Sequence, residues 1–423
     1  MQAPSKPQRF PALSVPHFRY YAITACLAMV GDNVEHVIGY WVIWQLTHST
    51  FWLGYALVAH WLPFTLLSLH SGSFADRFDC RWLIQVSQGL FITASIGWGV
   101  LFLTGELQVW HVAILLVVHG VAGLISAPSS MLIIHEMVGK EKLVSAISLN
   151  ASLRPLAHML GPLIGGGLMT WVGPGWGFLA NVAIYLPLSV LLLYLPYGGA
   201  VERRGGEAGW DYVLQGLATV RRSLTIVALL VVVASTSFLV GNTFQAFMPP
   251  FAERLGASAT GYSILLLAGG LGALGGGFLI GWIGSTKLRP VVVTTAVLMW
   301  TVLLIFFSFS TVYWISFGLL VLVGTTQIVF TSMAQSIIQA WAPPAVRGRV
   351  MGVYNLASSG TRVLSGVFLG SVAMRLGVVR GLIILAASIG VVVLATSSII
   401  RSLWKSELDE LPGQATTQGA SAA

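Results

Sequence analysis

Charged side chains are scarce in this sequence of 423 residues. Asp, Glu, Lys and Arg together make up 9% of it, whereas a soluble protein has about 25%. Hydrophobic residues make up 56% of the chain, and the mean hydropathy is +0.83. A membrane-spanning helix needs roughly 20 mostly apolar residues. The composition therefore excludes an ordinary soluble domain and predicts an all-α polytopic membrane protein.

Cysteine and enzyme motifs are also scarce. The two cysteines, Cys26 and Cys80, suggest neither a disulfide framework nor a zinc site. The sequence contains no phosphate-cradling Gly-Lys-Ser loop, no nucleophile elbow and no metalloprotease motif. Residues 1–19 are polar and proline-rich and do not have the pattern of a signal peptide. We therefore expect no enzymatic activity, no cofactor, and an ion gradient rather than ATP as the energy source.

Apolar segments separated by polar residues predict twelve spanning helices. They cover residues 20–46, 51–71, 82–104, 109–136, 143–171, 175–196, 224–250, 261–284, 290–309, 312–341, 349–374 and 379–400. The longest polar interruption follows the sixth span, and its second part, WDYVLQGLATVRRS, predicts a short helix on the membrane surface. The predicted domains are a cytoplasmic segment (1–19), a six-helix bundle (20–196), a cytoplasmic linker (197–223), a second six-helix bundle (224–401) and a disordered cytoplasmic tail (402–423).

Positive charge is distributed unevenly between the loops. With both termini in the cytoplasm, seventeen of the 22 Lys and Arg residues lie in cytoplasmic segments and three in outer loops. The remaining two, Arg154 and Arg362, fall inside spans. This asymmetry follows the positive-inside rule. It explains the net charge of +8 without a nucleic-acid partner, and it suits contact with anionic lipid head groups.

The two halves of the sequence are related. A shift of 205 residues places Asn150 on Asn355 and Gly161 on Gly366. Six-helix halves repeated in parallel are a known transporter plan, in which the substrate binds between the halves near the bilayer midplane. The repeat therefore predicts a transporter of a small molecule.

The loop between spans two and three reads GSFADRFDCR, residues 72–81. It resembles the signature loop of the major facilitator superfamily, with Cys80 at a position that is usually basic. The resemblance implies the major facilitator fold, with 12 transmembrane helices in two pseudo-symmetric bundles that work by alternating access. In that family the loop latches the two halves together on the cytoplasmic side. The residues expected to form the latch here are Gly72, Asp76, Arg77, Arg81, Arg347 and Arg349.

The fifth span contains NASLRPLAHMLGPLIGGG, residues 150–167. Gly161, Pro162, Gly165 and Gly166 resemble the antiporter motif of exporters in the same superfamily. The chain as a whole resembles the branch that holds bacterial macrolide-efflux proteins and the enterobactin exporter, although His158 stands where those proteins commonly have Arg. The resemblance implies proton-coupled export of amphipathic organic molecules, such as drugs or a siderophore, by a monomer in the bacterial inner membrane.

Titratable groups inside the predicted membrane domain are confined to the first half. No acid lies between Glu253 and Glu407, and the last histidine is His158. In the stretch GDNVEHVIGYW, Asp32, Glu35 and His36 have the spacing i, i+3, i+4 and so share one helix face. Ionisable residues are costly in a bilayer and usually mark a functional path.

These observations predict the proton-coupling residues. They are Asp32, Glu35 and His36, with Arg154 as the counter-charge and His158 nearby. His60 and His119 also lie in predicted spans and are candidates, but as lone histidines on apolar faces they are assigned to packing or to hydrogen bonding. The residues expected to line the substrate cavity are Asn33, Tyr40, Asn150, Asn242, Phe244, Gln245, Phe247, Asn355 and Arg362.

A second function stays open at this point. Gly31, Asp32 and His36 also resemble the first helix of ferroportin, and Asp with His four residues later can ligate a transition metal. The alternative is therefore a divalent metal exporter, for iron or cobalt, that uses Asp32 and His36.

Overall fold

The regular structure of the chain is helical throughout the part described. The structure is a computed structural model that describes residues 11–199, 210–221, 223–237, 242–283, 290–342, 346–359 and 361–409. No strand occurs in these ranges. A helix satisfies its own backbone hydrogen bonds, which is what a segment needs in order to cross a bilayer.

The helices follow one another with short connections. In chain order they are η1 (Pro11–Ser14), α1 (Pro16–Thr47), α2 (Thr50–Arg77), α3 (Cys80–Leu103), α4 (Val109–Trp171), α5 (Gly173–Tyr194), α6 (Trp210–Val220), α7 (Leu224–Thr236), α8 (Asn242–Ala246), α9 (Met248–Arg254), α10 (Ala259–Ile283), α11 (Pro290–Phe309), α12 (Tyr313–Trp341), α13 (Arg347–Ser359), α14 (Thr361–Leu376) and α15 (Val378–Asp409).

The boundaries of several predicted spans differ from those of the helices. Spans four and five are the two parts of α4, and the break predicted between them lies at Gly139, where the backbone departs from helical angles (φ 70°, ψ 172°). Glycine tolerates this positive φ without a Cβ clash, so a single residue can turn the backbone here. In span seven a turn at Phe247 separates α8 from α9, and the described part of span eleven comprises α13 and α14.

The last helix also differs from the prediction. α15 continues to Asp409, so the first part of the segment 402–423, which was expected to be disordered, is helical. The predicted surface helix is present as α6, which lies against α13.

Seven of the described helices have the length and hydropathy to cross a membrane, namely α3, the first part of α4, α5, α10, α11, α12 and α15. α1 has the length but not the hydropathy. Its middle carries Asp32, Asn33, Glu35 and His36, which are the polar residues that the sequence singled out. The candidate site therefore lies on a long helix whose composition is poorly suited to lipid, and this helix is largely buried among its neighbours.

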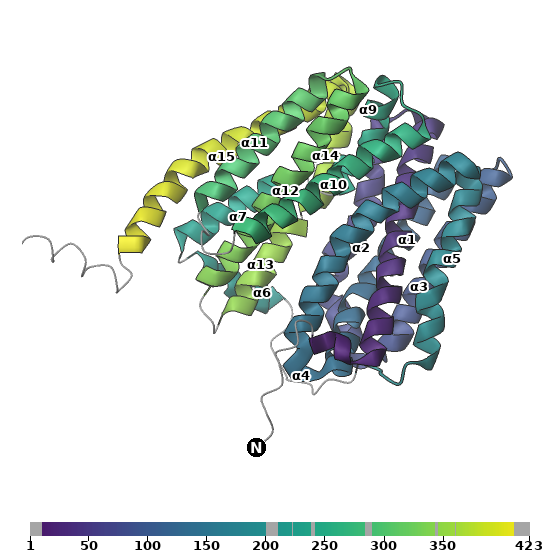
Figure 1. Cartoon of the computed structure of the whole chain (residues 1–423), viewed down its shortest axis with the longest axis horizontal. Coiled ribbons are helices and arrows are strands. Elements are labelled where there is room, and N and C mark those ends of the chain that lie inside the picture. The colour runs from purple at the N-terminus through teal and green to yellow at the C-terminus, as the bar shows by residue number, and fades with distance from the viewer. Residues whose placement is uncertain are drawn as a thin grey trace, which may run out of the picture.

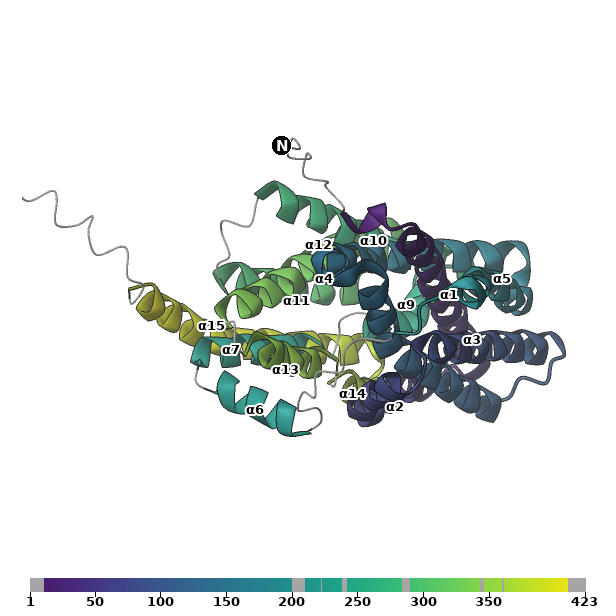
Figure 2. The same cartoon turned by 90° about the horizontal axis from the view of Figure 1, so that it is seen from below.

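The helices form two bundles, with α1 to α5 in the first and α7 to α15 in the second (Figure 1). The bundles converge near α9 and diverge towards α6 and the N-terminal end (Figure 1). The view from below shows the same two groups side by side (Figure 2). We call the two ends of the molecule the convergent end and the divergent end.

Small residues bring the bundles into contact. On α2, Gly54 faces Gly366 and Gly370 of α14 so closely that a Cβ on Gly54 would lie 2.4 Å from the Gly366 carbonyl oxygen. Between α4 and α10, a Cβ on Gly166 would lie 2.3 Å from the Cβ of Ser263. Close backbone approach through glycine is the usual way in which helices associate in a membrane.

Side-chain contacts join the bundles further at the convergent end. The Trp44 indole Nε1 donates a hydrogen bond to a Glu253 carboxylate oxygen, and His48 Nδ1 lies 3.8 Å from Glu253 Oε2. The ring of Trp41 stacks on that of Tyr262, with centroids 5.2 Å apart. The bundles are therefore closed against each other at this end.

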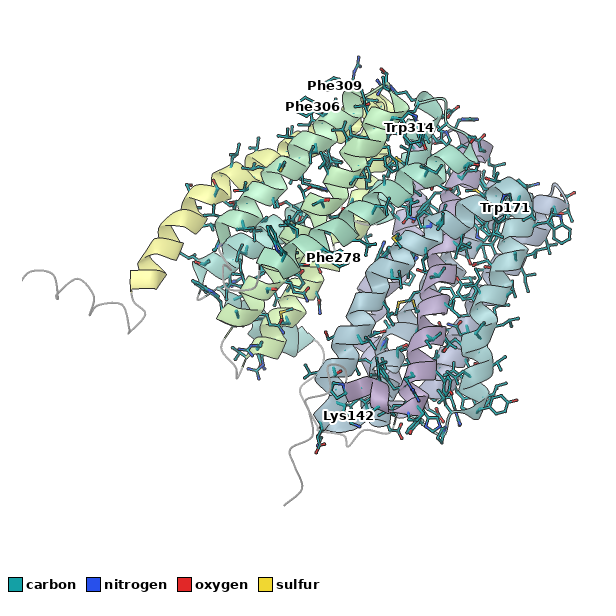
Figure 3. All side chains as sticks on the ribbon, in the orientation of Figure 1. Lys142, Trp171, Phe278, Phe306, Phe309 and Trp314 are labelled. Atoms are coloured by element: carbon teal, nitrogen blue, oxygen red, sulfur yellow. The ribbon has the colours of Figure 1, made fainter. Side chains whose placement is uncertain are left out.

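Large apolar side chains cover the outside of the molecule. Phe306, Phe309 and Trp314 project outward near the convergent end of the second bundle, and Trp171 does so on the first (Figure 3). Lys142 lies at the opposite, divergent end (Figure 3). Aromatic side chains commonly gather at the membrane interface, so this surface suits contact with lipid.

The antiporter-motif glycine Gly161 provides a test of the packing in the first bundle. A Cβ at this position would lie 2.3 Å from the Cβ of Asn33, in the contact between α4 and α1. Forcing an extra methyl group into a filled contact costs about 1–3 kcal/mol. We therefore expect Gly161→Ala to lower the midpoint of thermal unfolding of the purified protein.

Gly167 is the matched control, because it belongs to the same glycine-rich run and a Cβ there would have its nearest neighbour at 3.9 Å. Alanine also favours the helix over glycine by up to about 1 kcal/mol, so Gly167→Ala should unfold at or above the wild-type temperature. Equal midpoints for the two variants would contradict the packing described here.

Candidate functional site

The candidate site lies in the middle of α1, where Asp32, Glu35 and His36 share one face of the helix. Two further polar side chains reach this face from neighbouring helices, His60 from α2 and His119 from α4. Glu35, His36 and His119 are buried, and His60 is half-buried. The five side chains form one polar cluster inside the first bundle.

His119 bridges the two carboxylates. Its Nδ1 lies 2.9 Å from Glu35 Oε1, and its Nε2 lies 2.8 Å from Asp32 Oδ1. The side chains of Glu35 and His119 are each only 4% exposed, whereas 31% of the Asp32 side chain is exposed. The carboxylate–imidazole–carboxylate chain therefore runs from a partly open end at Asp32 to a closed end at Glu35.

This geometry requires a shared proton. Ionised carboxylates only accept hydrogen bonds, so contact with both of them requires an N–H on both nitrogens of His119. The same distances are met by a neutral imidazole with one protonated carboxyl group. In both arrangements the three side chains hold one labile proton that their hydrogen bonds can pass between them.

A second layer of polar groups holds Glu35 in place. The Ser95 hydroxyl of α3 donates to Glu35 Oε2 at 2.6 Å. Asn181 Nδ2 of α5 lies 3.3 Å from Ser95 Oγ and 3.0 Å from the Gly31 carbonyl oxygen. Because a buried carboxylate needs hydrogen bonds to offset its lost hydration, these contacts fix the position of Glu35.

The two other histidines lie against His119. The ring centroids of His36 and His60 are 4.7 Å apart, and those of His36 and His119 are 4.8 Å apart. His36 Nδ1 lies 2.7 Å from the Asp32 carbonyl oxygen. A carbonyl only accepts, so His36 carries a proton on Nδ1.

A small cavity adjoins the cluster. It has a volume of about 10 Å³ and is lined by Glu35, His36, Gly39, Tyr40, Trp98, Leu116 and His119. That volume is close to the minimum for one water molecule. The buried Tyr40 hydroxyl has no hydrogen-bond partner among the described residues. The cavity can therefore receive a water molecule or an ion, but not an organic substrate.

Several residues expected to line the substrate cavity are occupied in packing. Asn33 donates from Nδ2 to the Met29 carbonyl oxygen at 2.8 Å and is buried against Gly161. Phe247 is buried in the apolar core, and the Phe244 ring contacts Phe307 with centroids 5.7 Å apart. These three residues form interior contacts rather than the wall of a binding cavity.

Other predicted site residues have different positions. Asn150 and Gln245 are half-buried, and Asn355 is exposed on α13. His158 is exposed on α4 and does not belong to the histidine cluster. The side chains of Arg154, Asn242 and Arg362 lie outside the described part of the structure.

The predicted latch is described only in part. Gly72, Asp76 and Arg77 end α2, but their side chains lie outside the described part. Arg81 donates to the Leu195 carbonyl oxygen at 2.9 Å and to Asp79 Oδ2 at 3.2 Å, both in the first bundle. Arg347 is exposed and Arg349 is half-buried at the start of α13. These described contacts of Arg81 do not join the bundles.

The antiporter motif lies where α4 packs on α1 and α10. Gly161 and Gly165 face α1, at Asn33 and Val37 respectively, and Gly166 faces Ser263 of α10. Pro162 is buried within the same run. The motif thus allows close packing both inside the first bundle and across the bundle contact.

Sequence reasoning assigned His119 and His60 to packing or hydrogen bonding rather than to proton coupling, and the structure places both in the polar cluster. Ser95 and Asn181 were not considered at all. The available signal was that buried acids in α1 need partners from other helices, and His119 lies in a span of the same half. Its position opposite Asp32 depends on how α4 crosses α1, which periodicity along one helix does not reveal.

A family model described as transmembrane secretion effector matches residues 8–416. The chain belongs to this family. It is a transporter of the major facilitator superfamily, and neither its family nor its relatives are enzymes. The transporter is a multi-pass membrane protein, as the sequence predicted.

Two curated relatives are similar to the transporter over part of its length. The staphyloferrin A transporter of Staphylococcus aureus is 22% identical over 184 residues, which are 42% of this chain and 45% of that protein. A putative multidrug resistance protein, MdtD of Yersinia pestis, is 25% identical over 173 residues, which are 40% of this chain and 35% of that protein. The similarity thus spans less than half of each relative.

Solved structures confirm the fold. The nucleoside transporter NupG superposes with a TM-score of 0.70 at 14% identity, covering 90% of this chain and 98% of that one. A bacterial homologue of the human lysosomal transporter Spinster, in an inward-facing conformation, gives 0.68 at 14% identity and covers 96% of this chain and 100% of that one. At such identities the likeness concerns the fold alone.

Proposed function

We propose that the transporter is a proton-coupled antiporter that exports small amphipathic organic molecules, such as drugs or a siderophore. It works as a monomer in the bacterial inner membrane with both termini in the cytoplasm. The proton gradient supplies the energy, and no bound cofactor takes part. In this orientation the convergent end faces outward and the divergent end faces the cytoplasm, so the conformation is inward-facing.

The observation that carries the proposal is the chain Asp32–His119–Glu35. It holds a labile proton inside the first bundle, with hydrogen bonds of 2.8 and 2.9 Å and with one partly open end. Buried ionisable groups in transporters commonly serve as proton relays. The second half of the sequence has no carboxylate or imidazole within its spans, so no second relay of side chains competes with this one.

The side chains Asp32, His119 and Glu35 lie between α1 and α4, and this position couples proton movement to the movement of the bundles. When the outer end opens, a proton reaches the three side chains through Asp32; when the inner end opens, the proton leaves and substrate binds. α4 also contacts α10 of the second bundle through Gly166. A change in the charge at His119 therefore acts on a helix that lies in the contact between the bundles.

The substrate class is supported by the relatives rather than by a cavity. One relative is named for a siderophore and another for multidrug resistance. The alternative of a metal exporter receives one supporting observation, since ring nitrogens of three histidines lie within 4.8 Å of one another. However, the second half of the sequence contributes no histidine or cysteine, so a pathway through both bundles lacks ligands on one side.

The test is transport in proteoliposomes with an imposed pH gradient. The protein is reconstituted with a pH-sensitive dye inside, and cationic dyes, macrolides and carboxylate and catecholate siderophores are offered in turn. We expect at least one of these organic classes to move against its gradient together with an opposite proton flux. Glu35→Gln should abolish both fluxes, because an amide does not release a proton at neutral pH.

Glu106→Gln is the matched control, since Glu106 is an exposed acid in the loop before α4. It should transport like the wild type. Organic export that is unaffected by the pH gradient, or normal proton flux in Glu35→Gln, would contradict the proposal.

A further inference from the structure

We propose that His36, His60 and His119, together with Asp32, form a binding site for one divalent transition metal ion of the Co²⁺, Ni²⁺ and Zn²⁺ class. The site joins α1, α2 and α4. The site shares Asp32 and His119 with the proposed proton relay, but metal binding requires no ion gradient and is tested without transport.

The first argument is the distance between the ligand atoms. One ring nitrogen from each of the three histidines lies within 4.8 Å of the others. A tetrahedral ion with metal–nitrogen bonds of about 2.0–2.1 Å would hold such atoms about 3.3–3.4 Å apart. Metal binding would close this difference by rotation of the imidazole rings, two pairs of which meet edge to face.

The second argument is that two of the imidazoles are already oriented as metal ligands are. A metal-bound histidine almost always donates its other ring N–H to a carbonyl or a carboxylate. His36 donates from Nδ1 to the Asp32 carbonyl oxygen at 2.7 Å. His119 Nδ1 lies 2.9 Å from Glu35 Oε1. These contacts leave Nε2 of His36 for the ion, whereas Nε2 of His119 contacts Asp32 Oδ1 at 2.8 Å, a contact that the ion would replace.

Glu35 would not bind the ion but would orient the ligand His119, and a hydrogen bond fixes the position of Glu35 in turn. Ser95 donates to its second oxygen at 2.6 Å. Hydrogen bonds therefore link Ser95 to Glu35 and Glu35 to His119, which would bind the ion. A carboxylate behind a ligating histidine fixes the ring and makes it a better donor to the metal. Neither Ser95 nor Glu35 would touch the ion.

Asp32 supplies the fourth ligand. Its Oδ1 lies 2.8 Å from His119 Nε2 and 3.7 Å from His36 Nδ1. An ion between Asp32 Oδ1 and His119 Nε2 would take both as ligands after a small outward movement of the carboxylate. The charge also fits, since Asp32 and Glu35 together offset a divalent cation in a site that is otherwise apolar.

The cavity beside the cluster provides space. It holds about 10 Å³ and borders His36 and His119. The Tyr40 hydroxyl on its wall is buried and has no hydrogen-bond partner among the described residues. A water molecule in this cavity, beside the ion, would give the hydroxyl a partner.

The ligand set determines the class of ion. Imidazole with a single carboxylate suits Zn²⁺, Ni²⁺ and similar first-row ions, whereas Mg²⁺ and Ca²⁺ prefer sites built only from oxygen. The described residues around the cluster bring no cysteine to it, so soft ions such as Cu⁺ are not favoured. Co²⁺ is the best probe, because its visible absorption reports the geometry of its ligands.

The experiment is a titration of the full-length protein, purified in detergent and freed of metal by chelation, with Co²⁺ and then Zn²⁺. We expect one Co²⁺ per chain with the visible absorption of a four-coordinate site, and displacement of Co²⁺ by one equivalent of Zn²⁺. Mg²⁺ at the same concentration should leave the absorption unchanged. Ser95→Ala should weaken Co²⁺ binding by about 10-fold, the usual effect of losing an outer partner.

His60→Asn is the decisive variant and His135→Asn, elsewhere on α4, is its control. The first should lose the visible absorption and the second should keep it, with equal elution in size-exclusion chromatography as the check on folding. A wild-type protein that gives no absorption change, or a His60→Asn variant that gives the full change, would overturn the site. Neither result would alter proton-linked transport by metal-free protein, so the two proposals fail separately.

Discussion

His119→Gln is expected to lose proton-linked export while the protein stays folded. His119 contacts Asp32 with one ring nitrogen and Glu35 with the other. A glutamine amide can donate to one carboxylate, but it neither accepts nor releases a proton. Proton transfer by a positioned side chain contributes about 10²–10⁴-fold, so we expect export driven by a pH gradient to fall by at least about 100-fold.

The measurement is substrate flux in proteoliposomes with and without a pH gradient. Flux without the gradient, from high to low substrate concentration, should fall much less, because the bundles still move. His135→Gln, on the same helix, should behave like the wild type in both assays. Equal losses with and without the gradient would show that His119 serves transport only by holding the structure.

His119→Ala separates folding from coupling in the same experiment. It leaves two carboxylates in the bundle without the group between them. Removing one partner of a buried ionic contact costs about 3–5 kcal/mol. The alanine variant should therefore unfold at a clearly lower temperature than His119→Gln, and near-equal stability of the two would contradict the bridging contact.

Gly54→Val is expected to shift the transporter away from the conformation described here. A Cβ at Gly54 would lie 2.4 Å from the Gly366 carbonyl oxygen and 3.1 Å from the Gly370 Cα. Backbone atoms cannot move aside as a flexible side chain does, so α2 and α14 must separate at the convergent end. The hydrogen bond from Thr50 Oγ1 to the Gly370 carbonyl oxygen, at 3.3 Å, lies in the same contact and would be lost.

This shift can be measured by labelling of engineered cysteines. A cysteine in place of Tyr262, whose ring is buried against Trp41 at the convergent end, should react much faster with a membrane-impermeant maleimide in Gly54→Val than in the wild-type background. Gly318→Val is the control, because a Cβ at Gly318 meets no atom within 4 Å. Unchanged labelling in Gly54→Val would show that this contact does not hold the bundles together.

The sequence predicted the fold well because its signals are local. Apolar length identified the helices, and the break between predicted spans four and five is present as a kink at Gly139 in α4. The turn at Phe247, which separates α8 from α9 within span seven, was not visible in hydropathy, because hydropathy averages over many residues.

Only the part of the candidate site that lies on α1 was predicted. Asp32, Glu35 and His36 were recognisable because an acid is costly in a bilayer wherever it points, and that cost depends on residue type. His119 and His60 were not, because a histidine on an apolar helix is equally suited to packing and to a relay. Phe247 shows the reverse error, since an aromatic residue near a helix break resembles a binding wall but is buried in the core.

The sequence by itself determined the class of protein, the number of spans, the relation of the two halves and the restriction of titratable groups to the first half. Each of these depends on composition or on spacing along the chain. Only the tertiary structure decided which groups share a proton and which could share a metal ion. Those partners come from α1, α2, α3 and α4, and the distances between them are set by how the helices cross, through contacts such as Gly161 on Asn33. Hydrogen bonds and coordination depend on such distances to within a few tenths of an ångström, which no pattern along one helix specifies.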